Sequence, residues 1–166
     1  MTNDSPLAVI MRRKGLIAAV FLVFFGNHLR NLMRESATSA TILAGTAIVA
    51  VGAGVDMTIS IALAESADDI EPSSVQALQA LWDNDFMPMA IGIVVFLVSV
   101  GLSILKTGAL PKWMGWVALA LALIGITPLG FAAFMGSLLW ILVASVILIL
   151  RARGATAAPT GGPPSG

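Results

Sequence analysis

Residues 87–105, MPMAIGIVVFLVSVGLSIL, form an apolar run that contains no charged side chain. A helix needs about 20 mainly apolar residues to cross the hydrocarbon core of a bilayer, and this run has that length. A charge-free stretch of this kind has no polar face to present to water. The run therefore predicts a transmembrane helix, and this restricts the folds that the whole chain can adopt.

The composition extends the same conclusion to the rest of the chain. Its 166 residues are 58% hydrophobic and 11% charged, whereas a soluble domain has about 25% charged residues. The net charge is zero and the basic residues form no stripe, so we expect no nucleic-acid partner. With no cysteine and a single histidine, the sequence offers no thiol chemistry, no metal site and no cofactor site.

Five segments are expected to form the transmembrane domain of residues 15–153. The apolar block after residue 112 is too long for one straight span, and the sequence TPLG at 127–130 marks a break, because proline and glycine end helices. A polar segment, 1–14, precedes the domain, and a disordered tail, 154–166, follows it. The expected spans are 15–33, 39–64, 87–105, 113–127 and 131–150.

Residues 15–33 are a less regular span, because their continuous apolar run, GLIAAVFLVFFG, is short. A helix that continues to Met33 is roughly 28 Å long, and Arg30 and Arg34 can then extend to the headgroups. A basic start and a short apolar core are also typical of a signal peptide, but no small-residue cleavage site follows. We therefore expect an uncleaved, membrane-embedded helix that packs against 39–64.

The 65–86 loop, ESADDIEPSSVQALQALWDNDF, carries six of the nine acidic residues of the chain and no basic residue. Apolar residues recur in it at helical spacing after Pro72. This pattern predicts a short amphipathic helix that lies on the membrane surface. The residues of the apolar face are Val75, Leu78, Leu81 and Trp82.

Lys and Arg near the ends of spans mark the cytoplasmic side of a membrane. Three basic pairs fall on one side of an alternating chain, and the acidic loop falls on the other. The sequence therefore predicts a bacterial cytoplasmic-membrane protein with loop 65–86 outside and with loop 106–112 and the C-terminus in the cytoplasm. The pairs are Arg30 with Arg34, Lys106 with Lys112, and Arg151 with Arg153.

The stretch KTGALPKWMGW, residues 106–116, combines two lysines, two glycines, two tryptophans and a proline. We expect a helical hairpin and not a ligand site. Pro111 prevents the preceding helix from continuing, and Gly108 permits the turn. Trp113 and Trp116 have the amphipathic rings that concentrate at headgroup depth.

The basic residues Arg12, Arg13 and Lys14 do not fit this orientation. If 15–33 crosses the membrane, they lie on the extracytoplasmic side. Either the first helix lies in the cytoplasmic interface, or a further helix precedes it. The pattern RRKGLIAAVFLVFFGNHLRNLMRE, a small-residue span and TGALPKWMGWVAL before two closing spans resembles a group of uncharacterised actinobacterial multi-pass membrane proteins. The resemblance implies six spans, of which this chain would carry the second to the sixth, and it implies no catalytic residue.

Asp56 is the strongest candidate for a functional polar residue, because it lies within the 39–64 span. An acid at the centre of a span costs about 2.5–3.5 kcal/mol on insertion scales. Gly45 and Gly52 share its helical face, and small residues permit close helix contact, so the carboxyl should point into the bundle. It could serve as a proton or cation relay or as a substrate contact, or it could be a structural acid that reaches the outer headgroups.

A second candidate is the polar cluster of Asn27, His28 and Arg30 at the inner end of 15–33. Such a cluster could bind an anionic headgroup or a nucleotide phosphate, or it could simply end the helix at the interface. The sequence contains no Walker loop, GxSxG or HExxH pattern, so no catalytic residue is predicted.

The sequence as a whole predicts an all-α integral membrane bundle with four or five transmembrane helices and a short extracytoplasmic amphipathic helix. The expected role is that of a non-enzymatic component that contacts the lipid bilayer and associates with another copy or with a membrane protein partner. The alternative is a small transporter or channel subunit that uses Asp56 as its intramembrane site.

Overall fold

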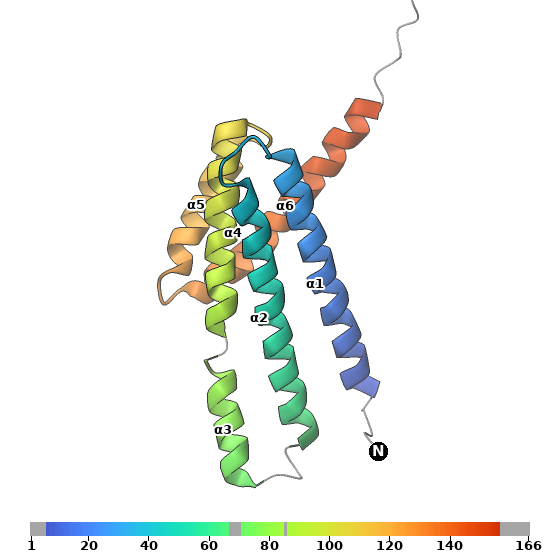
Figure 1. Cartoon of the computed structure of the whole chain (residues 1–166), viewed down its shortest axis with the longest axis vertical. Helices are drawn as coiled ribbons and strands as arrows, with labels where there is room; N and C mark the ends of the chain where they lie inside the picture. Colours follow the sequence, from blue (N-terminus) through green and yellow to red (C-terminus); the bar gives the residue numbers. More distant parts are fainter. Residues whose placement is uncertain (1–5, 67–70, 85, 157–166) are drawn as a thin grey trace, which may run out of the picture.

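The computed structural model describes residues 6–66, 71–84 and 86–156, and over these residues the chain is helical and contains no strand (Figure 1). The expected all-α bundle is confirmed. The six helices are α1 (Pro6–Leu32), α2 (Ser39–Ser66), α3 (Pro72–Trp82), α4 (Phe86–Thr107), α5 (Lys112–Gly125) and α6 (Gly130–Thr156).

Four of these helices, α1, α2, α4 and α6, lie in segments that are long and apolar enough to cross a membrane. The shortest of the four, α4, has 22 residues and is about 33 Å long, against a hydrocarbon core of about 30 Å. The fifth expected span, 113–127, is shorter in the structure. It corresponds to α5, whose 14 residues extend only about 21 Å.

α1 begins at Pro6, nine residues before the expected start at Gly15, and runs antiparallel along α2. Two close contacts define the packing: Gly15 lies against Met57, and Gly26 lies against Thr46. The two contacts are eleven residues apart on both helices, so the pair stays side by side over three turns. The expected packing of the first helix against 39–64 is therefore confirmed.

α2 and α4 pack through glycines on both helices. A Cβ added at Gly45 would lie 2.6 Å from the backbone nitrogen of Phe96, and one added at Gly92 would lie 2.7 Å from that of Val49. A Cβ added at Gly52 would lie 2.9 Å from the backbone nitrogen of Met89. Small residues allow this backbone approach. The small-residue face of α2 is thus covered by α4 within the chain and is not free to bind a partner.

The 106–116 stretch forms the expected hairpin between α4 and α5. Gly108 has a φ of +65°, and its N–H donates a 2.9 Å hydrogen bond to the carbonyl of Ile104, which is a left-handed helix ending that suits glycine. Pro111 precedes the first residue of α5 in an extended conformation. Trp113 and Trp116 are 55% and 65% exposed, as expected for residues that face headgroups.

α6 follows the break at 127–130 and crosses behind the other helices on a diagonal path (Figure 1). The N–H of the Trp140 side chain donates a 3.0 Å hydrogen bond to the carbonyl of Met114 in α5. Near the other end of α6, the guanidinium of Arg151 donates a 2.6 Å hydrogen bond to the carbonyl of Ala109. α6 is therefore attached mainly to the α4–α5 hairpin and packs little against α1.

α3 is the amphipathic helix expected in the 65–86 loop, but its orientation differs from the expectation. It extends the line of α4 and packs against the C-terminal part of α2 (Figure 1). The side-chain N–H of Trp82 donates a 3.1 Å hydrogen bond to the hydroxyl of Ser60, and Val75 and Leu78 are half-buried. One part of the apolar face of α3 thus covers the end of α2, whereas Leu81 and Trp82 stay exposed.

Candidate functional site

Asp56 is half-buried, and by helical periodicity it shares the face of α2 on which Gly45 and Gly52 pack against α4. Gly52 lies opposite Met89, and the helices are antiparallel. Four residues beyond Gly52, Asp56 is therefore level with the start of α4, just before Phe86. Asp56 forms no hydrogen bond with the residues that the structure describes.

The depth of Asp56 in a membrane can be inferred from Lys106, at the basic end of α4. If Lys106 marks one boundary of the hydrocarbon core, the other boundary falls about 20 residues earlier on α4, near Met87. Asp56 is level with this second boundary. The position fits an acid that reaches headgroups more closely than an acid in the middle of the membrane.

Asn27, His28 and Arg30 do not converge on a cavity. His28 and Arg30 are exposed and Asn27 is half-buried, whereas their neighbours Leu29 and Met33 are fully buried in the core. Leu29 and Met33 thus face the core, and the polar residues lie outside together with the exposed Leu32. The arrangement fits the end of a helix at the interface, with no bond among the three side chains.

A cluster of hydroxyl groups at the same end of the bundle has no counterpart in the sequence-based predictions. The hydroxyl of Thr38 lies 2.9 Å from that of Ser103 in α4, and Ser103 lies 3.0 Å from Ser36. One turn away, the hydroxyl of Ser99 donates a 2.8 Å hydrogen bond to Thr41. These bonds connect the start of α2 and the segment before it with α4. The spacing of Ser99 and Ser103 on one face of α4 is the only signal that could have indicated it.

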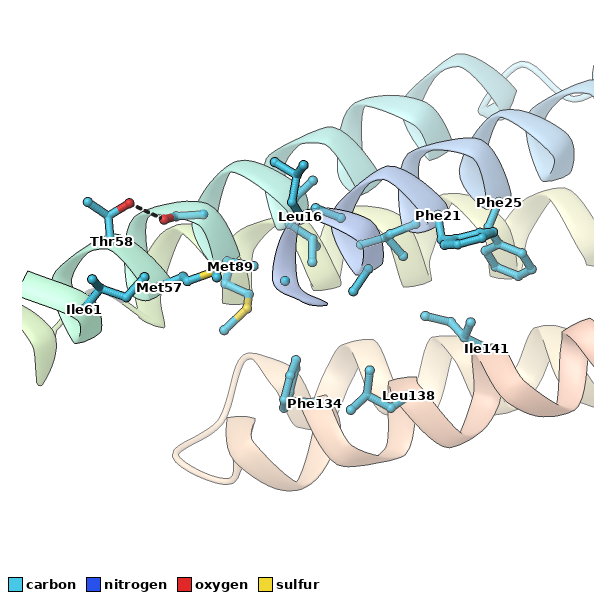
Figure 2. A pocket seen from close by; sticks show the side chains of 18 of the residues that line it. Leu16, Phe21, Phe25, Met57, Thr58, Ile61, Met89, Phe134, Leu138 and Ile141 are labelled. Carbon is cyan, nitrogen blue, oxygen red and sulfur yellow. Dashed lines mark hydrogen bonds between the residues drawn. The ribbon is translucent and has the colours of Figure 1, made fainter. Parts of the chain in front are cut away.

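A groove between α1, α2 and α6 has a volume of about 1000 Å³. This volume is at the upper end of the range of about 300–1,000 Å³ for ligand pockets. Figure 2 shows Phe134, Leu138 and Ile141 of α6 on one side and Leu16 of α1 with Met57 of α2 on the other.

The walls of the groove are almost entirely hydrocarbon. No charged residue lines it among those that the structure describes, and its two hydroxyl groups are both satisfied within their own helices. Thr58 donates to the carbonyl of Gly54 at 2.8 Å, a bond drawn in Figure 2, and Ser145 donates to that of Ile141 at 2.8 Å. A molecule in this groove would therefore meet apolar contacts almost everywhere, and neither of the two hydroxyl groups is left without a hydrogen-bond acceptor.

The described residues contain no group of three or more acidic or histidine side chains that could hold a metal ion. Comparison of the chain with protein-family models, with curated proteins and with solved structures finds no match. The geometry of the chain itself is thus the basis for the proposals that follow.

Proposed function

We propose that the chain is a non-enzymatic protein of the bacterial cytoplasmic membrane that holds another membrane component in the groove between α1, α2 and α6. The observation that carries this proposal is the groove itself, with its volume of about 1000 Å³ and its apolar lining. In a bilayer such a space is filled by hydrocarbon, because water finds no polar partner in it. What fills it is therefore another lipid-soluble component.

The proposed orientation follows from the basic residues at one end of the bundle. Thr38 joins the start of α2 to Ser103 near the end of α4, and Arg151 joins the end of α6 to Ala109 in the hairpin. Arg34, Lys106 and Arg153 lie in or next to these segments. By the distribution of Lys and Arg, this end is cytoplasmic and α3 is outside.

Transport is the alternative function, and its support is the half-buried, unbonded carboxyl of Asp56. The position of this carboxyl level with the start of α4 favours a structural role at the interface. Asp56 does not line the groove, so the two proposed functions rest on different residues and can be tested separately.

A groove-filling variant tests the proposed function. Ala53 lines the groove, and Ala53→Phe would occupy it. Val51, on the same helix, is 67% exposed outside the groove, so Val51→Phe is the matched control. Each protein is extracted from its membrane in polymer-bounded discs, transferred to detergent, and analysed by mass spectrometry for components that remain bound.

We expect the wild type and Val51→Phe to retain one component in a fixed ratio to the protein, and Ala53→Phe to lose it. Equal retention by all three proteins, with each of them folded, would show that the groove holds nothing specific.

A further inference from the structure

The groove covers the depth of one lipid leaflet. Its lining runs from Gly15 to Phe25 on α1 and from Phe134 to Ser145 on α6. These segments are about 16 and 18 Å long, close to half of a hydrocarbon core of about 30 Å. A molecule that fills the groove therefore needs the length of one leaflet and not that of the whole membrane.

The groove lies in the leaflet nearest α3. Gly15 lies against Met57, which follows Asp56 and is therefore level with the membrane boundary near the start of α4. Gly26 lies against Thr46, about 16 Å further along both helices and thus close to the midplane. The lining of α1 therefore extends from headgroup depth to the level where the two leaflets meet.

The inner end of the groove is blind. On α1 the last lining residue is Phe25, and Leu29, one turn further, is fully buried in the core. On α6 the last lining residue is Ser145, and its neighbour Ala144 is fully buried as well. The walls of the groove therefore meet near the midplane, and a long molecule cannot continue through them into the other leaflet.

A much smaller cavity adjoins this end, with a volume of about 40 Å³. It reaches Thr46, one turn further along α2 than the groove does, and Phe96 of α4 also lines it. Leu22 of α1 and Leu138 of α6 line both spaces, so these two side chains lie between the groove and the cavity. Shortening either leucine would therefore lengthen the groove.

The groove opens sideways toward lipid. Leu16 and Phe21 of α1 line it and are nevertheless exposed, and so is Leu138 on the opposite wall (Figure 2). α1 and α6 pack little against each other. A flexible chain can therefore enter between the two helices and lie along the groove.

We infer that the groove holds an acyl chain of a phospholipid from the leaflet nearest α3, and that its blind end limits the length of the chain that fits. An acyl chain has the length of one leaflet, can follow a narrowing space, and needs no polar partner in the groove. A transmembrane helix is a poorer occupant, because it needs a contact surface through both leaflets. This inference rests on the proposed function, and it adds the class of ligand and the property by which the ligand is selected.

The inference is tested with the full chain in detergent, to which dimyristoyl and diarachidoyl phosphatidylcholine are added together in equal amounts. The two lipids differ only in the length of their saturated chains, and native mass spectrometry measures how much of each is bound. Leu22→Ala and Leu138→Ala each open the blind end into the small cavity. Leu16→Ala is the matched control, because it removes the same atoms at the outer end of the groove. Myristic acid serves as a competitor, to distinguish a phospholipid site from a site for a free fatty acid.

We expect the wild type and Leu16→Ala to prefer the shorter lipid about tenfold, at the low end of the discrimination that an apolar pocket achieves against extra methylene groups. This preference should fall to roughly threefold or less in Leu22→Ala and Leu138→Ala, because the longer chain gains space at its end. Myristic acid at the same concentration should not displace the phospholipid.

Equal binding of both lipids by the wild type, or displacement of the phospholipid by myristic acid, would overturn the inference. An unchanged preference in the leucine variants would overturn it as well. Leu138 is exposed, so Leu138→Ala keeps this test valid even if Leu22→Ala does not fold.

The two proposals fail in different ways. If Ala53→Phe loses a bound component while the wild type binds both lipids equally, or if that component is a helix of another protein, the acyl chain is wrong and the groove function remains. If Ala53→Phe retains everything that the wild type binds and no variant changes the preference for chain length, both proposals are wrong.

Discussion

The Trp140 side chain of α6 donates its N–H to the backbone carbonyl of Met114 in α5, at 3.0 Å. The same indole ring packs edge-on against Phe96 of α4, with ring centroids 6.0 Å apart. One buried residue thus connects three helices, among them α5, which is too short to cross the hydrocarbon core. The wall of the groove formed by α6 depends on this attachment, since α6 packs little against α1 itself.

Trp140→Phe should destabilise the protein by about 2 kcal/mol, because it removes a buried hydrogen bond and part of a well-packed ring. Trp116→Phe is the control. The Trp116 side chain is 65% exposed, so this substitution should change the free energy of unfolding little. The measurement is denaturant-induced unfolding in detergent. Equal midpoints for the two variants would contradict the role assigned to Trp140.

Gly45→Ala should separate α2 from α4. The added Cβ would lie 2.6 Å from the backbone nitrogen of Phe96, which cannot rotate away, so the cost should be about 1–3 kcal/mol. Gly54→Ala is the matched control on the same helix, because its Cβ would meet no atom within 4 Å. That change should stabilise α2 by up to about 1 kcal/mol. Thermal unfolding measures the change in stability of each variant. A loss of stability in both Gly45→Ala and Gly54→Ala would show that the close contact between α2 and α4 does not explain the loss.

The hydroxyl cluster should act as a coupled unit. Thr38→Val and Ser103→Ala each remove one partner of a 2.9 Å contact, so the double variant should lose less than the sum of the two single losses. A coupling of about 0.6 kcal/mol is typical of such bonds between membrane helices. Ser145→Ala is the control, because its hydroxyl bonds only to Ile141 of its own helix. Strict additivity of Thr38→Val and Ser103→Ala would argue against the cluster.

The features that the sequence predicted are local in origin. The apolar composition and the glycine and proline signals at Gly108, Pro111 and 127–130 act on a few neighbouring residues, so the helices and the hairpin could be inferred without knowledge of their packing. The face of Gly45, Gly52 and Asp56 was predictable for the same reason, since helical periodicity determines which residues share a side.

The features that the sequence did not predict depend on the register between helices. The depth of Asp56 follows from the pairing of Gly52 with Met89, which α2 alone does not specify. The hydroxyl cluster needs Thr38 and Ser103 to meet, although 65 residues separate them. The groove arises because α6 crosses the bundle on a diagonal path, and no periodicity in 131–150 specifies that path.

The absence of cysteine makes the orientation directly testable. Ser74 in α3 and Lys112 at the hairpin are both exposed, so single cysteines at these positions should react freely from their own side of the membrane. An impermeant thiol reagent applied to whole cells should label the cysteine at 74 and spare the one at 112, which should react only after lysis. The reverse pattern would place α3 in the cytoplasm.

Asp56→Asn distinguishes the groove function from transport. The substitution keeps the size of the side chain and most of its hydrogen-bonding capacity, and it removes the ability to exchange a proton. A proton-coupled carrier needs that exchange, whereas an acid at headgroup depth does not. We therefore expect wild type and Asp56→Asn to show equal proton leak in reconstituted vesicles under an imposed potential, and equal thermal stability within about 0.5 kcal/mol. Glu71→Gln is the control, because it removes one carboxylate from an exposed side chain that makes no capping hydrogen bond to α3. A proton flux that is present in the wild type and in Glu71→Gln, and lost only in folded Asp56→Asn, would establish transport and reject the structural interpretation of this residue.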